Sequence, residues 1–210
     1  MLGRGAGVTD FSLQQLVLRL IAYVFIAGVH GFAVAAAAVA LGDAGPRHDG
    51  RLRLNPLAHL DLLGTASGVL FSVGWIRPIA VDPTALRIGR VGLLAVTAAG
   101  AAASLVGVIV LRTLRPLILP MLQDTRSADL FALVETISEL SLWFVLFNML
   151  PLPPLTGAHG LNAIAPGWRE SIHRSEPYAG VVLAVLAASG VFAQLLGPPY
   201  RMLAAMVLGT

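Results

Sequence analysis

The chain has 210 residues, of which 57% are hydrophobic and 12% are charged. This composition is too apolar for an ordinary soluble domain and is typical of a polytopic membrane protein. The net charge of +3 comes from arginine without lysine, and its spread over short loops gives no indication of nucleic-acid binding. The absence of cysteine excludes disulfides and thiol chemistry.

Long apolar segments define the expected helices. A helix needs roughly 20 apolar residues to cross the hydrocarbon core of a bilayer. Four segments meet this length, namely residues 12–41, 91–111, 130–150 and 178–197. A fifth, residues 57–75, is borderline, and the tail from Pro198 is expected to lie at the interface or to pack on the bundle. We therefore predict an all-α polytopic protein with about five transmembrane or re-entrant helices, forming one integral membrane domain over residues 1–210.

The loop after the first segment predicts a small β-hairpin near residues 44–56. Residues 43–50 are rich in turn formers, and residues 51–54 alternate charged and apolar side chains as a short strand does. This loop and the loop after residue 75 are both basic. The positive-inside rule places both on the cytoplasmic side only if residues 57–75 do not cross fully, and a re-entrant segment meets this condition where protein shields its backbone.

Prolines interrupt the helix that ends near residue 148. Pro151, Pro153 and Pro154 cannot continue an α-helix, so the backbone unwinds at membrane depth. Unwound backbone is tolerated there only where it lines a cavity or is buried in protein. Asn148 precedes the prolines, and its amide group can pair with exposed backbone. This segment is therefore predicted to line a binding groove.

Several short motifs follow one another in a specific order. They are Gly50-Arg51-Leu52, Leu54-Asn55-Pro56-Leu57, His59, Asp61, Gly64-Thr65, Gly74-Trp75-Ile76-Arg77-Pro78 and Val81-Asp82-Pro83. With residues 147–161, this order resembles the compact bacterial branch of the site-2 protease family, the M50-type intramembrane zinc metalloproteases. The resemblance covers most of residues 25–165 and implies a site-2-protease-like helical bundle.

The chain departs from this family at the positions that carry the chemistry. The first family motif, His-Glu-x-x-His, is similar to residues 30–34, which keep His30 but have Gly31 and Val34 in place of the glutamate and the second histidine. The aspartate of the second motif is replaced by Thr156. A catalytic zinc needs about three protein ligands and an open water position. The resemblance thus implies a degenerate site without cofactor, and we expect a pseudoprotease that is not an enzyme.

Three histidines are the weak metal candidates. His30 matches the surviving ligand, whereas His59 and His159 match family histidines to which we assign structural roles. A lone histidine on a helix is more often a hydrogen-bonded core residue than a ligand. If the three converged, they would form a substitute site, because imidazole suits zinc, copper and iron. The predicted binding groove comprises His30, Asn148, Pro151, Pro153, Pro154, Thr156 and His159.

Two acids in an apolar segment have alternative interpretations. Glu135 and Glu139 lie four residues apart, and ionisable groups inside a membrane often mark a proton path or a partner contact. Alternatively, both acids fall near the start of their helix, where they can reach headgroup water or pair with Arg112 or Arg115. The second interpretation is favoured.

The sequence favours a binding or scaffolding role in the bacterial cytoplasmic (inner) membrane. The expected partners are lipids, other membrane proteins or the transmembrane helix of a client, and the chain could be an accessory subunit of a membrane complex. One alternative is an active intramembrane zinc metalloprotease with rebuilt ligands. Another is a small transporter or channel, for which Glu135, Glu139 and Gln194 are the candidate polar groups.

Overall fold

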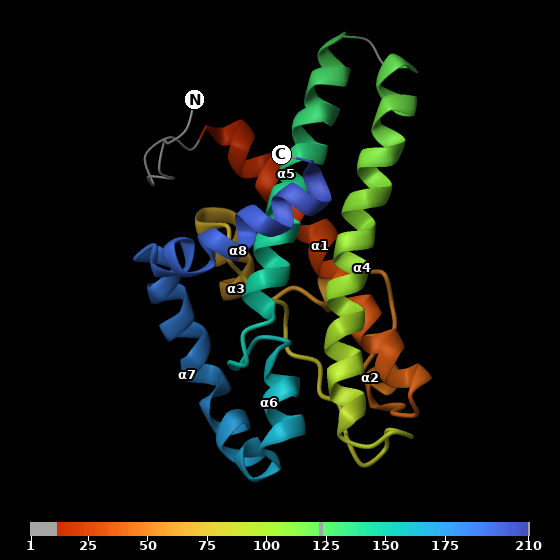
Figure 1. Cartoon of the computed structure of the whole chain (residues 1–210), viewed down its shortest axis with the longest axis vertical. Helices are drawn as coiled ribbons and strands as arrows, with labels where there is room; N and C mark the ends of the chain where they lie inside the picture. Colours follow the sequence, from red (N-terminus) through yellow and green to blue (C-terminus); the bar gives the residue numbers. More distant parts are fainter. Residues whose placement is uncertain (1–11, 122–123, 210) are drawn as a thin grey trace.

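The computed structural model describes residues 12–121 and 124–209, which fold almost entirely into helices (Figure 1). The helices are α1 (Leu13–Ala40), α2 (Gly45–His48), α3 (Leu62–Phe71), α4 (Val91–Ile118), α5 (Asp124–Asn148), α6 (Ala158–Ile164), α7 (Arg169–Ala188) and α8 (Val191–Leu208). Short 3-10 turns join them at Pro56–Ala58, Leu119–Met121 and Pro166–Trp168.

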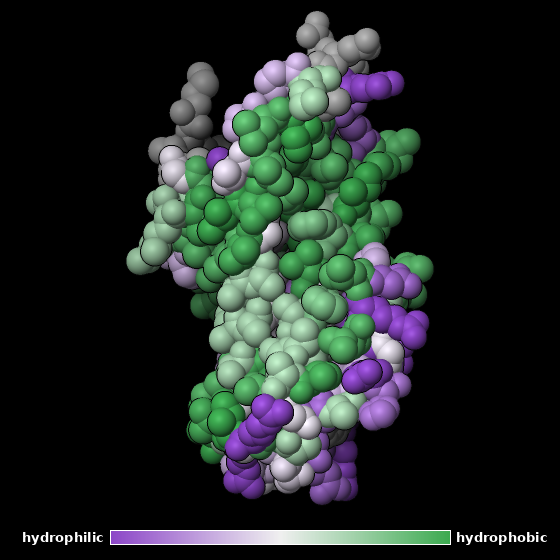
Figure 2. Space-filling view, turned by 90° about the vertical axis from the view of Figure 1, so that its right-hand side faces the viewer, coloured by the Kyte–Doolittle hydropathy of each residue, from purple (hydrophilic) through white to green (hydrophobic). Residues whose placement is uncertain are grey.

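Four of these helices are long and apolar enough to cross a membrane. They span Leu13–Ala40, Val91–Met121, Arg126–Asn148 and Val191–Leu208. Figure 2 shows hydrophobic residues over much of one face and hydrophilic residues toward its upper and lower ends. The chain is therefore a multi-pass helical membrane protein, as the composition predicts.

Helix α1 lies at the centre of the bundle and packs against α4 and α5. The Oγ of Ser12 accepts a hydrogen bond from the backbone N–H of Gln15 and so caps the start of α1. Apart from Gly28, its buried residues recur as pairs or single residues every three or four positions: Ala22, Tyr23, Ile26, Ala27, His30, Gly31, Val34, Ala35 and Ala38. This spacing places one continuous face toward the core.

Helix α4 approaches α1 closely at Gly100. A Cβ atom at this position would lie 2.6 Å from Cγ2 of Val34 and 2.8 Å from Cε1 of His30. Gly107, farther along α4, faces Phe25 and Val29 of α1 across a wider gap. Small residues thus let two membrane helices pack closely within this chain.

The predicted β-hairpin near residues 44–56 is wrong. This stretch forms α2 and a turn at Gly50, whose φ of 69° lies in the left-handed region. Arg51 breaks the expected alternation because its side chain turns inward to donate hydrogen bonds to distant carbonyl groups. Among the described residues, the only β-type pairing is an isolated antiparallel bridge between Leu60 and Ile76.

Residues 57–75 contain only one short apolar helix, which is below the length of a candidate membrane span. Helix α3 has only 10 residues and ends at Ser72, where φ is 64°. The backbone N–H of Arg87 donates to the carbonyl of Leu41 at 2.8 Å, so the loops before and after α3 meet. Both basic loops therefore lie at the same end of the molecule, so the positive-inside rule can place both on the cytoplasmic side.

The window over residues 178–197 is not one helix. Gly190 adopts φ 77° and ends α7, and α8 starts at Val191. Helix α8 crosses α5 in Figure 1 and packs on it through Tyr200, whose ring stacks on Trp143 with centroids 4.4 Å apart. The tail from Pro198 is therefore part of a helix that packs on the bundle.

Candidate functional site

His30 lies at the centre of the site and is completely buried. Its Nδ1 is 3.2 Å from Oγ of Ser104, and its Nε2 is 3.0 Å from Oγ1 of Thr156. The Ser104 hydroxyl already donates to the carbonyl of Gly100, so it accepts from the Nδ1–H of His30. Nε2 then carries the lone pair and accepts from the Thr156 hydroxyl. Both ring nitrogens are satisfied by hydroxyl groups.

The three positions that correspond to the family's zinc ligands do meet in space. Val34 and His30 both pack against Gly100, since a Cβ there would lie 2.6 Å from Val34 Cγ2 and 2.9 Å from His30 Nε2. Thr156 reaches the same imidazole from the unwound segment after α5. The motif alignment is therefore geometrically consistent, although Val34 offers no lone pair.

The position of the family's glutamate is filled by an imidazole ring. A Cβ atom at Gly31 would lie 2.3 Å from Nδ1 of His59, so a longer side chain cannot stand there while His59 keeps its place. His59 is fully buried, and its Nε2–H donates to the carbonyl of Arg53 at 2.9 Å. Burial lowers the pKa of His59, and the bond to Arg53 partly opposes this shift.

The residues present do not fit the zinc that the family implies. The lone pair of His30 is engaged by Thr156, Val34 is apolar, and Nδ1 of His59 faces Gly31 without a partner. Over residues 12–121 and 124–209, no group of three or more His, Cys, Asp or Glu side chains is placed to hold a metal ion. His30, His59 and His159 therefore do not form the substitute three-histidine site.

The segment between α5 and α6 is unwound and tightly turned. Asn148 is buried, and its Nδ2 donates to the carbonyls of Gly74, at 2.9 Å, and Phe144, at 3.0 Å. The backbone N–H of Gly157 donates to the Asn148 carbonyl at 2.7 Å, which closes the loop. A Cβ at Gly157 would lie 2.2 Å from the Leu150 carbonyl oxygen, so only glycine fits this turn.

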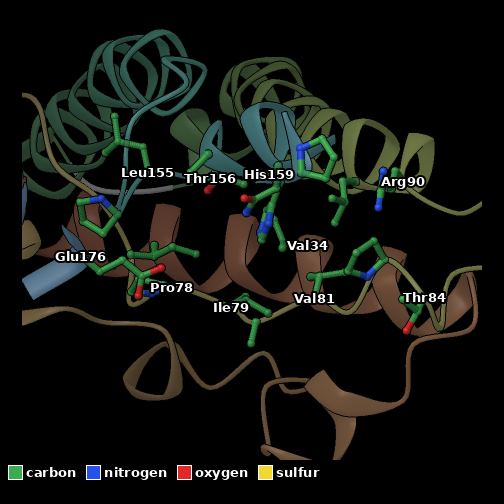
Figure 3. A pocket seen from close by; sticks show the side chains of 18 of the residues that line it. Val34, Pro78, Ile79, Val81, Thr84, Arg90, Leu155, Thr156, His159 and Glu176 are labelled. Atoms are coloured by element: carbon green, nitrogen blue, oxygen red, sulfur yellow. The ribbon is translucent and has the colours of Figure 1, made fainter. Parts of the chain in front are cut away.

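A cavity of about 680 Å³ opens beside this segment (Figure 3). One wall is the extended stretch from Ile76 to Thr84, and the opposite wall runs from Pro154 to His159. Val34 of α1 and Leu93 of α4 line the cavity between the walls. The polar or charged groups on its lining include Arg90, His159, Asn162 and Glu176, and Figure 3 shows Glu176 and Arg90 toward opposite ends.

The predicted groove residues divide into two groups around this cavity. Pro154, Thr156 and His159 line it. His30 and Asn148 are buried behind the lining, and Pro151 and Pro153 do not contribute to it. Sequence reasoning missed the wall from Ile76 to Thr84, although the prolines at 78 and 83 signal an extended, non-helical stretch.

The middle of the missed wall has free main-chain groups. Within the part of the chain that the structure describes, the backbone N–H and C=O groups of Ile79, Ala80 and Val81 have no hydrogen-bond partner. The wall is fixed on both sides of this stretch, since Arg77 N–H donates to the His59 carbonyl and Asp82 N–H donates to Asp43. Three residues are thus left unpaired between two hydrogen-bonded ends.

The two membrane acids lie apart from the cavity. Glu135 accepts from Arg112 at 3.0 Å and also pairs with Arg115. Arg112 further donates to the carbonyl of Leu208 at 3.2 Å, which joins α4, α5 and the end of α8. Neither Glu135 nor Glu139 lines the cavity. Glu135 is therefore held by two arginines, in line with the favoured interpretation.

The helical bundle, the converging motif positions and the unwound segment define the class as a membrane protein built like an intramembrane metalloprotease. Over 175 residues the chain is 32% identical to the Bacillus subtilis (strain 168) protein named "Putative zinc metalloprotease YwhC", an alignment that covers 81% of this chain and 80% of that protein. The chain therefore belongs to the site-2-protease-like family. No protein-family model and no solved structure matches the chain.

This comparison corrects the expectation that the chain is not an enzyme. A relative of this similarity that is named a zinc metalloprotease points to an enzyme. The expectation rested on the departures from the family motifs at Gly31, Val34 and Thr156. The missing glutamate and the two missing ligands describe the local site, and they do not by themselves decide what the whole protein does.

Proposed function

We propose that this protein binds an extended segment of a client membrane protein in the cavity between the Ile76–Thr84 wall and the Pro154–His159 wall. The observation that carries the proposal is the unpaired backbone of Ile79, Ala80 and Val81 along one side of this cavity. A strand-like client can add to such an edge because its own main-chain groups supply the missing partners.

The shape and chemistry of the cavity support this role. Its volume of about 680 Å³ lies within the range of roughly 300–1,000 Å³ that is typical of binding sites. The lining is mainly apolar and includes Ile79, Val81 and Leu155, with Glu176 and Arg90 toward opposite ends and Thr156 and His159 between them. An unwound, mostly apolar client segment matches this arrangement. In this proposal the protein acts in the bacterial cytoplasmic membrane, alone or as a subunit of a complex.

A second candidate function is cleavage of the bound segment. The name of the Bacillus subtilis relative favours it. The residues around His30 do not fit the family's zinc, so the geometry supports binding of the segment further than it supports a chemical step. The two functions share the same cavity, and one experiment separates them.

The experiment is photo-crosslinking in native membranes. A photoreactive amino acid replaces Ala80, which lines the cavity, and in a control it replaces Ala85, which is also exposed in the same loop but does not line the cavity. The proposal predicts an adduct from position 80 that maps to one short segment of one membrane protein, and no such adduct from position 85. Adducts at equal yield from both positions, or lipid adducts only, would contradict it.

The identified client then tests cleavage. The client is expressed with the wild-type protein and with a His30→Ala variant, and its length is measured by mass spectrometry. A shortened client that depends on His30 establishes proteolysis. A client that stays full length in both membranes establishes binding alone.

A further inference from the structure

Two buried charged residues hold the cavity wall at its two ends. Arg51 is only 6% exposed, although it belongs to the loop after α2. Its guanidinium donates to the carbonyls of Arg77, at 2.9 Å, and Pro78, at 2.7 Å, and it also donates to the Ala58 carbonyl. These contacts fix the wall immediately before Ile79.

Asp43 holds the other end of the same stretch. It is 5% exposed and follows the last turn of α1. Its Oδ2 accepts the backbone N–H of Asp82 at 2.8 Å, and its Oδ1 accepts that of Gly45 at 2.8 Å. The carboxylate therefore joins the start of α2 to the residue that follows Val81.

Both side chains direct their charge at main-chain groups. A buried charge is costly unless hydrogen bonds satisfy it, and charge-assisted bonds are roughly twice as strong as neutral ones. Burial lowers the pKa of Arg51, which remains a cation because its ordinary value is far above neutrality. The hydrogen bonds of Arg51 go to three carbonyl oxygens, and those of Asp43 come from two amides, so each residue fixes backbone geometry.

We infer that Arg51 and Asp43 are positioning residues that set the place of the Ile79–Val81 wall and thereby what the cavity accepts. The inference about the client rests on the proposed function, whereas the inference about the wall does not. Only three residues separate the two anchors, so loss of either anchor shifts the whole unpaired stretch. The loop after α1 thus controls a cavity wall more than 20 residues away in sequence.

The test uses the cysteine-free chain as a clean background for alkylation. Val81→Cys reports on the wall, and Val108→Cys reports on the core of α4. Val108 is a matched control for Val81 because the two side chains are 0% and 7% exposed. Both thiols are therefore shielded in the folded protein. Alkylation rates by a small maleimide are compared in the parent, Arg51→Gln and Asp43→Asn backgrounds.

Asp43→Asn is the milder variant, because its amide can still accept from Gly45 through Oδ1 but cannot accept from Asp82 through the nitrogen. Arg51→Lys tests rescue, since one ammonium keeps the charge but not the planar fork. We expect alkylation at position 81 to rise about tenfold or more in Arg51→Gln and Asp43→Asn, less in Arg51→Lys, and at position 108 not at all.

Unchanged alkylation at position 81 in the folded variants would overturn the inference. A parallel rise at positions 81 and 108 would also overturn it, because it would show general loosening in place of local positioning. The readout needs no client, so a negative photo-crosslinking result at Ala80 would reject the proposed function and leave this inference standing.

Discussion

Around His30, individual side chains occupy the space of a metal site. They also form hydrogen bonds with the groups that a metal ion would bind. His59 occupies the place next to Gly31, Val34 packs against Gly100, and Thr156 donates to the imidazole. Each substitution is matched by its neighbours, so His30 itself is enclosed by packed side chains, whereas Val34 and Thr156 also line the cavity. The energetic consequences can be measured one residue at a time.

Gly31→Ala should destabilise the protein although alanine is the better helix former. The new Cβ would meet His59 Nδ1 at 2.3 Å, and overpacking of this kind costs about 1–3 kcal/mol. Gly107→Ala is the matched control, because its nearest contact is 3.8 Å and the change should be neutral or stabilising. Unfolding in detergent measures both. Combining Gly31→Ala with His59→Ala should give less than the sum of the two losses, and simple additivity would refute the contact.

Thr156→Val should leave Nε2 of His30 buried without a donor. The loss is expected to be about 1–3 kcal/mol of unfolding free energy. Thr113→Val is the control, since the Thr113 hydroxyl donates only to Ile109 in its own helix and is exposed. Equal stability of the two variants would show that the His30–Thr156 bond contributes nothing.

At the scale of elements, a cluster of charged side chains holds helices together at one end of the bundle. Arg112, Arg115 and Glu135 join α4 to α5, and the bond from Arg112 to Leu208 adds α8. The sequence alone allows Glu135 to be an isolated acid inside the membrane, whereas the structure pairs it with two arginines. The role of the cluster is therefore to hold three helices together.

Glu135→Gln should weaken this junction, because the two arginines lose their carboxylate partner. Glu135 is partly exposed, so the loss is expected to be modest, about 1 kcal/mol. Glu139→Gln, one turn away on the same helix, is the control and should change stability less. Thermal unfolding in the same detergent compares the two, and a larger loss for Glu139→Gln would contradict the assignment.

The sequence predicts elements well where periodicity and length decide them, as in α1, α4 and α5. It fails where contacts with residues that are distant in sequence determine the local structure. Arg51 turns away from a hairpin because carbonyls at residues 58, 77 and 78 accept its hydrogen bonds. One of the two cavity walls could be predicted, because prolines mark the unwound segment after α5. The opposite wall lies more than 70 residues earlier, and no local pattern joins the two.

At the scale of the whole molecule, the loops on either side of α3 lie at one end. The Arg87–Leu41 backbone bond and the short α3 require this arrangement. Single cysteines at the exposed positions His48 and Ala85 should therefore react with an impermeant maleimide from the same side of the membrane, the cytoplasmic side by the positive-inside rule. Labelling from opposite sides would show that residues 57–75 cross the bilayer.

Binding of a client segment in the cavity is the function that we propose, and amide hydrogen exchange tests it most directly. Pro78 and Pro83 carry no N–H, so the stretch between them reports only the amides of residues 79–82. Asp82 is already bonded to Asp43, whereas the amides of residues 79–81 are unpaired. With the client identified at Ala80 bound, exchange at residues 79–81 should slow strongly while Asp82 changes little. Unchanged exchange at residues 79–81 in the client-bound protein would contradict the proposed binding mode.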